Sequence, residues 1–483
     1  MKNHLRDVFR FGVISGVILY IFFIIFIKDS GCKASTSLNL WTFFPLKLAQ
    51  TSPNTSSISL PPQKTNLSHL YFGLLGSEEA WHYRKAYIES WWRPSAIKGY
   101  LYLDEQPKGH DILPWSKNSP PYRVSENLTN FLQETGATAP VMIRMVHGIM
   151  EAFRQAETEK GLDLRWLVMG DDDSIFFVDN IVELLASVDH NKYYYFGGQS
   201  EYILSNFWFS FNQGFGGAGF MLSYPLAKAL ANDMENCLRR YAHVKSADTI
   251  TMACIADIGV NVSPHKGFHQ IDLRGDISGL LSAHPKSPLI SLHHFDAIDP
   301  IFPSKDRFES TRHLMKATSF GQSRMLQQTI CYERRNNWSV SISWGYSVHI
   351  YEQIMSRRVL QTPIETFTTW VGNPNPPRYM FNTRRSTNDS CETPHVFYFD
   401  SIKKLKMEHG DYVIETLYSR ASERGLPACG NHSAHYISKF KLISPTTHRI
   451  QNGRCECCDI VEGADEDTLM VKYRQCKTNE IIA

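Results

Sequence analysis

Residues 165–180 read RWLVMGDDDSIFFVDN, and this stretch decides the fold that the sequence predicts. The apolar run Trp166–Met169 is typical of a buried strand, and three adjacent aspartates, Asp171–Asp173, follow it directly. A helix is expected next, through Val182–Ala186. Because open α/β sheets bind ligands beyond the carboxyl ends of their strands, the stretch predicts a strand, an acidic ligand-binding turn and a helix.

Short apolar runs and amphipathic segments alternate on both sides of this stretch. We expect strands at His69–Gly76, Gly99–Leu103 and Tyr193–Gly198, and helices at Trp81–Trp92, Val141–Glu159, Pro225–Cys237 and Ala247–Ile258. Strands that alternate with helices predict a three-layer α/β sandwich.

Composition divides the chain into successive parts. The predicted parts are a tail at 1–10, an apolar segment at 11–27, a stem rich in Ser, Thr and Pro at 28–66, an α/β domain at 67–321, and a β-rich, cysteine-containing extension at 322–483. The extension is predicted from β-branched and aromatic runs such as Trp338–Tyr351. No separate activity is assigned to it.

The apolar segment predicts a membrane anchor. Phe11–Ile27 carries no charge, and as a helix it would be about 25 Å long, enough to span a thin bilayer. Lys2, Arg6 and Arg10 precede it, so the positive-inside rule places the N-terminus in the cytosol and the rest of the chain in the lumen. A cleaved signal peptide is the competing interpretation, but the run is longer than a usual apolar region and no A-x-A site follows.

The cysteines and glycosylation acceptors fit a lumenal location. The chain has 10 cysteines, an even number, and N-x-[ST] acceptors at Asn54, Asn66, Asn127, Asn261, Asn337, Asn388 and Asn431. The group Cys455, Cys457, Cys458 and Cys476 could suggest zinc, but adjacent thiols lack the spacing of a structural zinc site. We therefore expect disulfides in an oxidising compartment.

Composition excludes several classes of protein. Lys+Arg number 50 and Asp+Glu 48, so the net charge of +2 gives no reason to expect a nucleic-acid partner. A hydrophobic fraction of 43% and a charged fraction of 20% exclude a wholly disordered, collagen-like or polytopic membrane protein.

The acidic triplet is the strongest chemical signal. Three adjacent carboxylates repel one another unless a cation offsets their charge, and hard oxygen ligands suit Mg²⁺ or Mn²⁺. A surface turn or a helix N-cap is an equally ordinary explanation of the triplet alone. Later in the chain follow the glycine-rich loop Gly216–Gly219, Asp248 at a predicted helix start, and His293 and His294 after an apolar strand. Taken singly, these are ordinary loop, cap and histidine residues.

Taken in order, the motifs resemble a known family. WLVMGDDDSIF, GGAGFMLS, AD before TITMAC, and SPLISLHHFD are similar to the motifs of Fringe and related lumenal β-1,3-glycosyltransferases, and are most similar to the plant Fringe-related group. The resemblance covers about Ser68 to Tyr351. It implies a GT-A fold, a Golgi membrane location as a single-pass type II protein, and an inverting, metal-dependent transfer from a nucleotide sugar.

The resemblance also implies a role for each candidate residue. Asp172, Asp173 and His294 would bind Mn²⁺ or another divalent cation, with His293 left open as the alternative to His294; Asp171, Arg84 and Gly217 would contact the UDP-sugar donor; and Asp248 would be the catalytic base. Arg84 could equally belong to a solvated helix face. Three features depart from the family: Ala247, where Fringe proteins usually have a second acidic residue; the extra segment Gly267–Pro285; and the chain from about Tyr351 onward, which has no counterpart in animal Fringe proteins.

Two hypotheses follow. The first is an enzyme that moves a sugar from a UDP-sugar to a glycan or glycoprotein hydroxyl in a β-1,3 linkage. The second is a non-catalytic lumenal glycan-binding or scaffold protein that retains the fold. The intact carboxylate cluster favours the enzyme, because a scaffold has no need for it. A metal-dependent hydrolase would need a second ligand cluster, which the sequence does not indicate.

Overall fold

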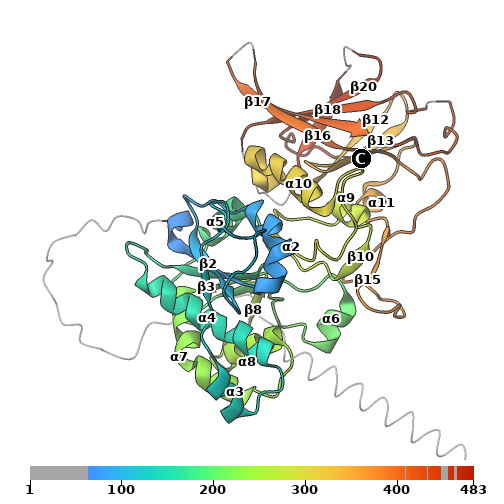
Figure 1. The fold of residues 1–483 in the computed structure, drawn as a ribbon. Helices are drawn as coiled ribbons and strands as arrows, with labels where there is room; N and C mark the ends of the chain where they lie inside the picture. Colours follow the sequence, from blue (N-terminus) through green and yellow to red (C-terminus); the bar gives the residue numbers. More distant parts are fainter. Residues whose placement is uncertain (1–63, 408–409, 432, 448–454, 462–464, 483) are drawn as a thin grey trace, which may run out of the picture. The chain divides into compact units, whose positions relative to one another are not determined.

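The computed structural model describes residues 64–407, 410–431, 433–447, 455–461 and 465–482 (Figure 1). The described residues all belong to one compact unit, Gln63–Ala483. The predicted tail at 1–10, the anchor at 11–27 and most of the stem at 28–66 lie outside the described residues. Within the described part, no helix is both long and apolar enough to cross a membrane.

A seven-stranded sheet forms the centre of the α/β part. Its order is β3-β2-β1-β4-β7-β6-β8, with bounds β1 Leu70–Leu75, β2 Lys98–Leu103, β3 Tyr122–Val124, β4 Trp166–Asp171, β6 Tyr195–Gly197, β7 Phe220–Ser223 and β8 Val262–Pro264. Strands β3, β2, β1 and β4 are parallel, whereas β7 runs antiparallel to β4 and β6. The strands predicted from the sequence at β1, β2, β4 and β6 are confirmed.

Helices cover both faces of this sheet because its strands bury side chains on both faces. Along β1, Leu70 and Phe72 join one apolar core with α2 (Glu78–Glu89) and α5 (Val178–Leu185). Tyr71 joins a second core with α4, α7 and α8. These helices, which lie together in Figure 1, span Pro140–Thr158, Tyr224–Arg240 and Ala247–Asp257. The predicted three-layer α/β sandwich is confirmed.

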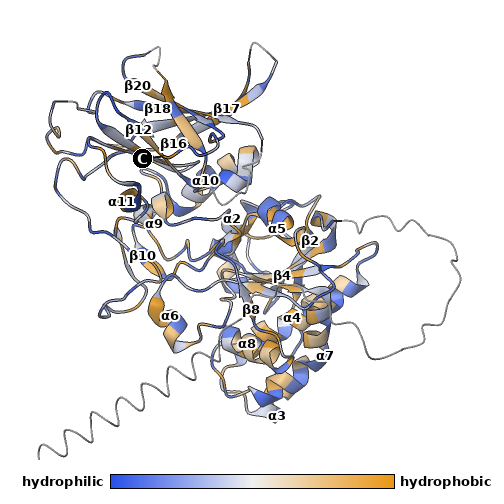
Figure 2. Ribbon diagram, turned by 180° about the vertical axis from the view of Figure 1, so that it is seen from behind, coloured by the Kyte–Doolittle hydropathy of each residue, from blue (hydrophilic) through white to orange (hydrophobic). Residues whose placement is uncertain are grey.

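Hydropathy follows this layering. Figure 2 shows hydrophobic and hydrophilic residues together on α4 and α7, as expected of helices that bury one face. The remaining helices are η1 Leu67–His69, α3 Thr129–Thr135, α6 Ile203–Trp208, α9 Ser278–Ala283, α10 Arg307–Gly321, η2 Gln322–Arg324 and α11 Arg357–Leu360.

A small three-stranded sheet brings distant motifs together. It pairs β5 (Ile175–Phe176) antiparallel with β11 (Ser291–Leu292), and β11 parallel with β9 (Phe268–His269). The start of β5 and the ends of β11 and β9 therefore lie at the same end of the sheet. The acidic triplet directly precedes β5 and the two adjacent histidines directly follow β11, so both motifs lie at this end.

The later part of the chain forms an eight-stranded sheet, as the β-branched texture predicts. Its order is β12-β13-β14-β16-β17-β18-β20-β19, with bounds Gln328–Glu333, Trp338–Ser343, Ser347–Tyr351, His395–Lys406, Tyr412–Arg420, Lys439–Pro445, Thr468–Arg474 and Cys457–Val461 in that order. Between β14 and β16, β15 (Phe367–Thr369) returns to pair with β10 (Leu273–Gly275). Residues beyond 322 therefore contact the α/β part, and the division at 321 stays a prediction.

Disulfides account for most of the described cysteines. The pairs are Cys237–Cys254, Cys331–Cys458, Cys391–Cys429 and Cys457–Cys476, and Cys455 has no disulfide partner within the described ranges. The preference for disulfides over zinc in the late cysteine group is confirmed. The first pair joins α7 to α8, so it fixes the helix that carries Asp248.

Candidate active site

The acidic triplet divides between two sets of contacts. Asp171 ends β4, and Asp172 and Asp173 lie in the turn that follows, which the Ser174 N–H closes by donating to the Asp171 carbonyl at 3.2 Å. The Nε2 atom of His293 lies 3.1 Å from Oδ1 of Asp173, in hydrogen-bond contact. One ligand atom each from Asp171, Asp173 and His293 lies within 4.8 Å of the other two. These three residues are therefore one group of the described chain that could hold a metal.

Asp172 is paired with an arginine. Nη1 of Arg84 donates to Oδ1 of Asp172 at 2.8 Å, and the N–H of Ser77 donates to Oδ2 at 3.3 Å. Arg84 also donates to Asp296 at 2.6 Å and lies 3.4 Å from Asp173. The sequence assigned Asp172 to the metal and Arg84 to the donor. The structure pairs the two side chains, one from the turn after β4 and one from α2, and metal binding by Asp172 and donor contact by Arg84 stay predictions.

The two adjacent histidines also point apart. His293 follows β11 and contacts Asp173, whereas the backbone of His294 turns to a φ of +58°, in the left-handed region. Nδ1 of His294 lies 3.1 Å from Oδ1 of Asp272, and its ring stacks on Trp370 with centroids 4.4 Å apart. In the structure, His293 rather than His294 therefore groups with the carboxylates. His293 is the alternative that the sequence left open.

Burial and neighbouring charges shift the pKa values of this group in different directions. Burial raises the pKa of Asp171 to about 7 and that of Asp172 to about 6. Burial acts in the same direction on Asp173, but His293 and Arg84 outweigh it and hold the pKa of Asp173 below its usual range. For His293, burial lowers the pKa, but the Asp173 carboxylate outweighs this and raises it to about 9.

These residues fit a divalent cation. Oδ2 of Asp173 and Nδ1 of His293 are buried without a hydrogen-bond partner among the described residues. Two carboxylates and an imidazole are a donor set that suits Mn²⁺ and similar ions. Burial disfavours the negative charge of Asp171 and so raises its pKa. A bound cation would stabilise that negative charge.

The glycine-rich loop lies between this group and Asp248. The N–H of Gly216 donates to Oδ1 of Asp248 at 2.9 Å. A Cβ atom on Gly217 would lie 2.0 Å from Cε1 of His293. The Gly217 carbonyl accepts a hydrogen bond from the Ser174 hydroxyl at 2.6 Å, so this turn also fixes the loop. The absence of a side chain at 217 therefore makes room for the histidine, and donor contact by Gly217 stays a prediction.

Asp248 lies in the first turn of α8, after the N-cap Ser246, whose side chain accepts from the N–H of Thr249. Burial raises the pKa of Asp248 to about 6, and the hydrogen bond from Gly216 opposes this rise. Within the described part of the chain, nothing bonds the second carboxylate oxygen. Asp248 is therefore ionised at neutral pH, with one oxygen held and one available to a ligand.

The structure adds residues that the sequence did not indicate. Gln270 accepts from the N–H of Ala218 at 2.8 Å and thereby supports the glycine-rich loop, while Asp272 contacts His294. Both lie in the extra segment Gly267–Pro285. Asp296 was visible in the HHFD motif, but only the fold shows that it pairs with Arg84. Trp370 comes from the segment after β15, and no sequence signal connects it with the histidines.

Comparison with known families supports this site. The family described as "Protein of unknown function, DUF604" matches residues 205–458, and the family described as "Fringe-like" matches residues 123–281. The Fringe-like match includes the acidic triplet, the DUF604 match includes His293, and both include the glycine-rich loop and Asp248. No curated protein matches the chain.

Proposed function

Because this chain belongs to a Fringe-related family, the one described as a protein of unknown function, DUF604, we propose that it is an inverting, metal-dependent glycosyltransferase with a GT-A-like fold. It moves a sugar from a UDP-sugar to a hydroxyl of a glycan or glycoprotein and forms a β-1,3 linkage. One observation carries the proposal: residues 216 and 217 of a single loop contact Asp248 and His293, respectively, so a base and a metal-binding group flank one backbone segment. The narrower likeness to plant Fringe-related proteins stays a prediction.

On the donor side, Asp171, Asp173 and His293 would hold the cation. The cation supplies the positive charge that stabilises the leaving diphosphate. Arg84 balances the charge of Asp172 and orients it, and its direct contact with the donor is part of the proposal. The glycine-rich loop lets backbone approach the nucleotide sugar closely.

On the acceptor side, Asp248 removes the proton of the attacking hydroxyl. The Gly216 N–H holds Oδ1, so the other oxygen is oriented for the acceptor. The proton passes to the carboxylate while the hydroxyl oxygen attacks the anomeric carbon from the face opposite the diphosphate. This geometry inverts the configuration of the sugar.

We place the enzyme in the Golgi lumen, anchored by residues 11–27. The disulfides support an oxidising compartment. Protease treatment of intact microsomes should spare the chain after Lys28, and glycosidase treatment should lower its apparent mass. Digestion of the α/β part from the cytosolic side would overturn this topology.

The decisive test of activity is donor hydrolysis by the purified full chain, with Mn²⁺ and a panel of UDP-sugars. This assay needs no acceptor. We expect hydrolysis of one or a few donors, and its loss in Asp173→Asn. If no donor is hydrolysed and UDP binding is insensitive to a chelator, the transferase proposal fails, and the non-catalytic glycan-binding alternative is favoured.

A further inference from the structure

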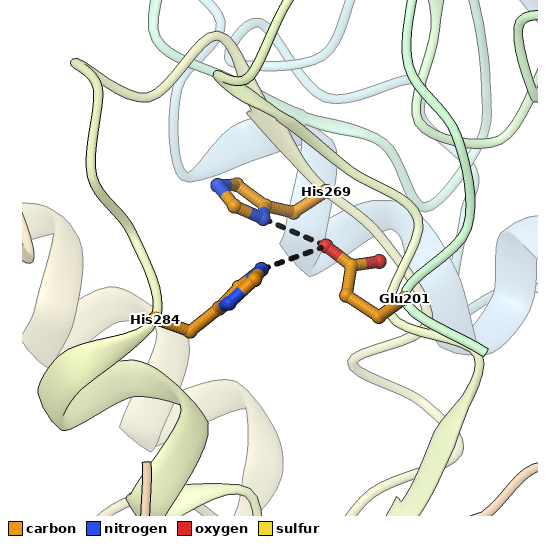
Figure 3. A group of neighbouring side chains, drawn as sticks. All are labelled: Glu201, His269 and His284. Atoms are coloured by element: carbon orange, nitrogen blue, oxygen red, sulfur yellow. Dashed lines mark hydrogen bonds and ion pairs between the residues drawn. The ribbon is translucent and has the colours of Figure 1, made fainter. Parts of the chain in front are cut away.

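A second group of ligand-type side chains lies outside the candidate active site. Figure 3 shows His269 and His284 directed at the same carboxylate oxygen of Glu201. Nδ1 of His269 lies 2.7 Å from Oε1 of Glu201, and Nε2 of His284 lies 3.9 Å from it. The three ligand atoms lie within 4.8 Å of one another. Glu201 precedes α6, His269 ends β9 and His284 follows α9, so the fold rather than local sequence assembles the group.

The carboxylate of Glu201 is held in place, but within the described residues it has no lysine or arginine partner. Its Oε2 atom accepts the N–H of Ile271 at 2.7 Å, which leaves Oε1 directed at the histidines. Glu201 is 4% exposed, and in the described part of the chain neither lysine nor arginine pairs with it. Lys286, which lines the same cavity, donates instead to the carbonyl of Gln361. A buried carboxylate of this kind needs compensating charge.

The imidazoles suit a metal. Imidazole nitrogens are among the commonest protein ligands of Zn²⁺, and one from each ring faces the same oxygen of Glu201. Tetrahedral Zn²⁺ with ligands at about 2.0–2.1 Å places neighbouring ligand atoms roughly 3.3 Å apart. The observed 2.7 Å and 3.9 Å lie on either side of that value, so small side-chain rotations suffice.

The group also opens on a cavity of about 410 Å³, which Glu201, His269, His284, Lys286 and Phe381 help to line. Three protein ligands beside an open space correspond to a metal site that keeps one coordination position for water or a ligand. The chain leads from this cavity to the candidate active site, because His269 lines the cavity and the next residue, Gln270, bonds the glycine-rich loop.

A comparable buried carboxylate, Glu352, lies beside the later sheet, and its charge is balanced by an arginine. Glu352 contacts His395 at 2.9 Å, but Arg424 neutralises it at 2.8 Å and the N–H groups of Cys429 and Ala434 also donate to it. Its charge and its hydrogen-bonding capacity are both satisfied. Glu201 has no equivalent of Arg424.

We propose that Glu201, His269 and His284 form a second metal centre that binds Zn²⁺, with the fourth position open to the cavity. Nitrogen ligands from two histidines favour Zn²⁺ over the Mn²⁺ expected at the acidic triplet. This centre does not depend on the transferase activity proposed above. Binding of the ion would join the segments before α6, at β9 and after α9, and would therefore raise the thermal stability of the fold.

The test uses Co²⁺ as a spectroscopic probe of the full chain carrying Asp173→Asn, which removes the first group. We expect one equivalent of Co²⁺ with the visible absorption of a tetrahedral complex, and its displacement by Zn²⁺. His284→Ala and Glu201→Gln should each weaken Zn²⁺ binding at least about tenfold. His435→Ala, at an exposed histidine beside Glu352 and His395, should leave binding unchanged. In the wild type, Zn²⁺ should raise the melting temperature, and this rise should vanish in His284→Ala.

Circular dichroism separates loss of ligation from loss of folding. If His284→Ala is not folded, His284→Gln replaces it, because an amide of similar length fills the space but ligates poorly. A folded variant at residue 284 that binds Zn²⁺ as tightly as its parent would overturn the proposal. So would a purely octahedral Co²⁺ spectrum in the Asp173→Asn chain.

Discussion

Gly217 and His293 are in such close contact that a Cβ atom on residue 217 would lie 2.0 Å from Cε1 of the histidine ring. The preceding residue, Gly216, donates its N–H to Asp248. Two consecutive glycines therefore determine how close the candidate base and the candidate metal-binding group come to each other. The sequence indicates that this loop is glycine-rich, and the structure supplies the steric reason.

We predict that Gly217→Ala displaces the His293 ring. Overpacking of this kind costs about 1–3 kcal/mol of the free energy of unfolding, and the displaced ring can no longer lie beside Asp173. Mn²⁺-dependent UDP binding should fall at least about tenfold, which is 1.4 kcal/mol. Calorimetric titration of UDP in Mn²⁺ measures this effect.

Gly321→Ala provides the matched control. Residue 321 has an extended φ of 168°, and the nearest atoms to an added Cβ lie 3.9 Å away. This variant should bind UDP as the wild type does. Equal binding by both glycine variants would show that the close approach at residue 217 does not matter to the site.

The aspartates of the triplet should differ in effect. Asp173→Asn should abolish Mn²⁺-dependent UDP binding, because residue 173 belongs to the group with His293. Asp172→Asn should weaken it less, because that side chain bonds Arg84. Titration of both folded variants, with and without chelator, compares them. A larger loss in Asp172→Asn would contradict the division of the triplet described above.

Asp248 should set the acidic limb of the pH profile. Only the ionised carboxylate accepts a proton, and its pKa is about 6, so kcat/KM should fall about tenfold per pH unit below that value. Asp248→Asn should retain donor binding while transfer falls 10²–10⁴-fold, the usual contribution of a positioned base. Asp257→Asn, the same change at the exposed end of α8, should transfer normally. Near wild-type turnover in Asp248→Asn would mean that another group is the base.

The later sheet should lose stability in acid. Burial, with Arg424 and Arg420 nearby, lowers the pKa of His395 to about 4. The unfolded chain therefore binds this proton first, and the stabilisation present above pH 6.5 is lost as the pH falls to 4, by about 3 kcal/mol. Burial opposes ionisation of Glu352, but the N–H groups of Cys429 and Ala434 outweigh it and lower its pKa to about 2, so further loss follows below pH 4.5. Urea unfolding at pH 7, 5 and 4 measures both effects.

Substitution tests whether His395, rather than another histidine, causes the loss of stability in acid. Nδ1 of His395 accepts from Arg420 and Nε2 donates to Glu352, so protonation of Nδ1 would remove the acceptor that Arg420 uses. His395→Gln should flatten the dependence of the unfolding free energy on pH between 6.5 and 4. His243→Gln, at an exposed position, should not. An unchanged slope in His395→Gln would assign the acid sensitivity elsewhere.

The elements that the sequence predicted best are those with strong local signals. Trp166–Asp171 forms β4 because an uninterrupted apolar run can be buried on both faces of a sheet. Pro140–Thr158 forms α4 because its apolar residues recur at helical spacing. Asp171–Asp173, the glycine-rich loop and Asp248 were likewise recognisable, since each motif is short and contiguous.

The sequence by itself determined the α/β class, the order of the motifs and the chemical types of the site residues, because periodicity and motif order are properties of neighbouring residues. Only the tertiary structure decided which member of each adjacent set faces the candidate metal site. Asp171 and Asp173 group with His293, whereas Asp172 bonds Arg84, and His293 reaches Asp173 while His294 reaches Asp272. Such choices depend on side-chain direction at the ends of β4 and β11 and on contacts from distant residues such as Trp370. Adjacent identical residues carry no local signal that distinguishes them.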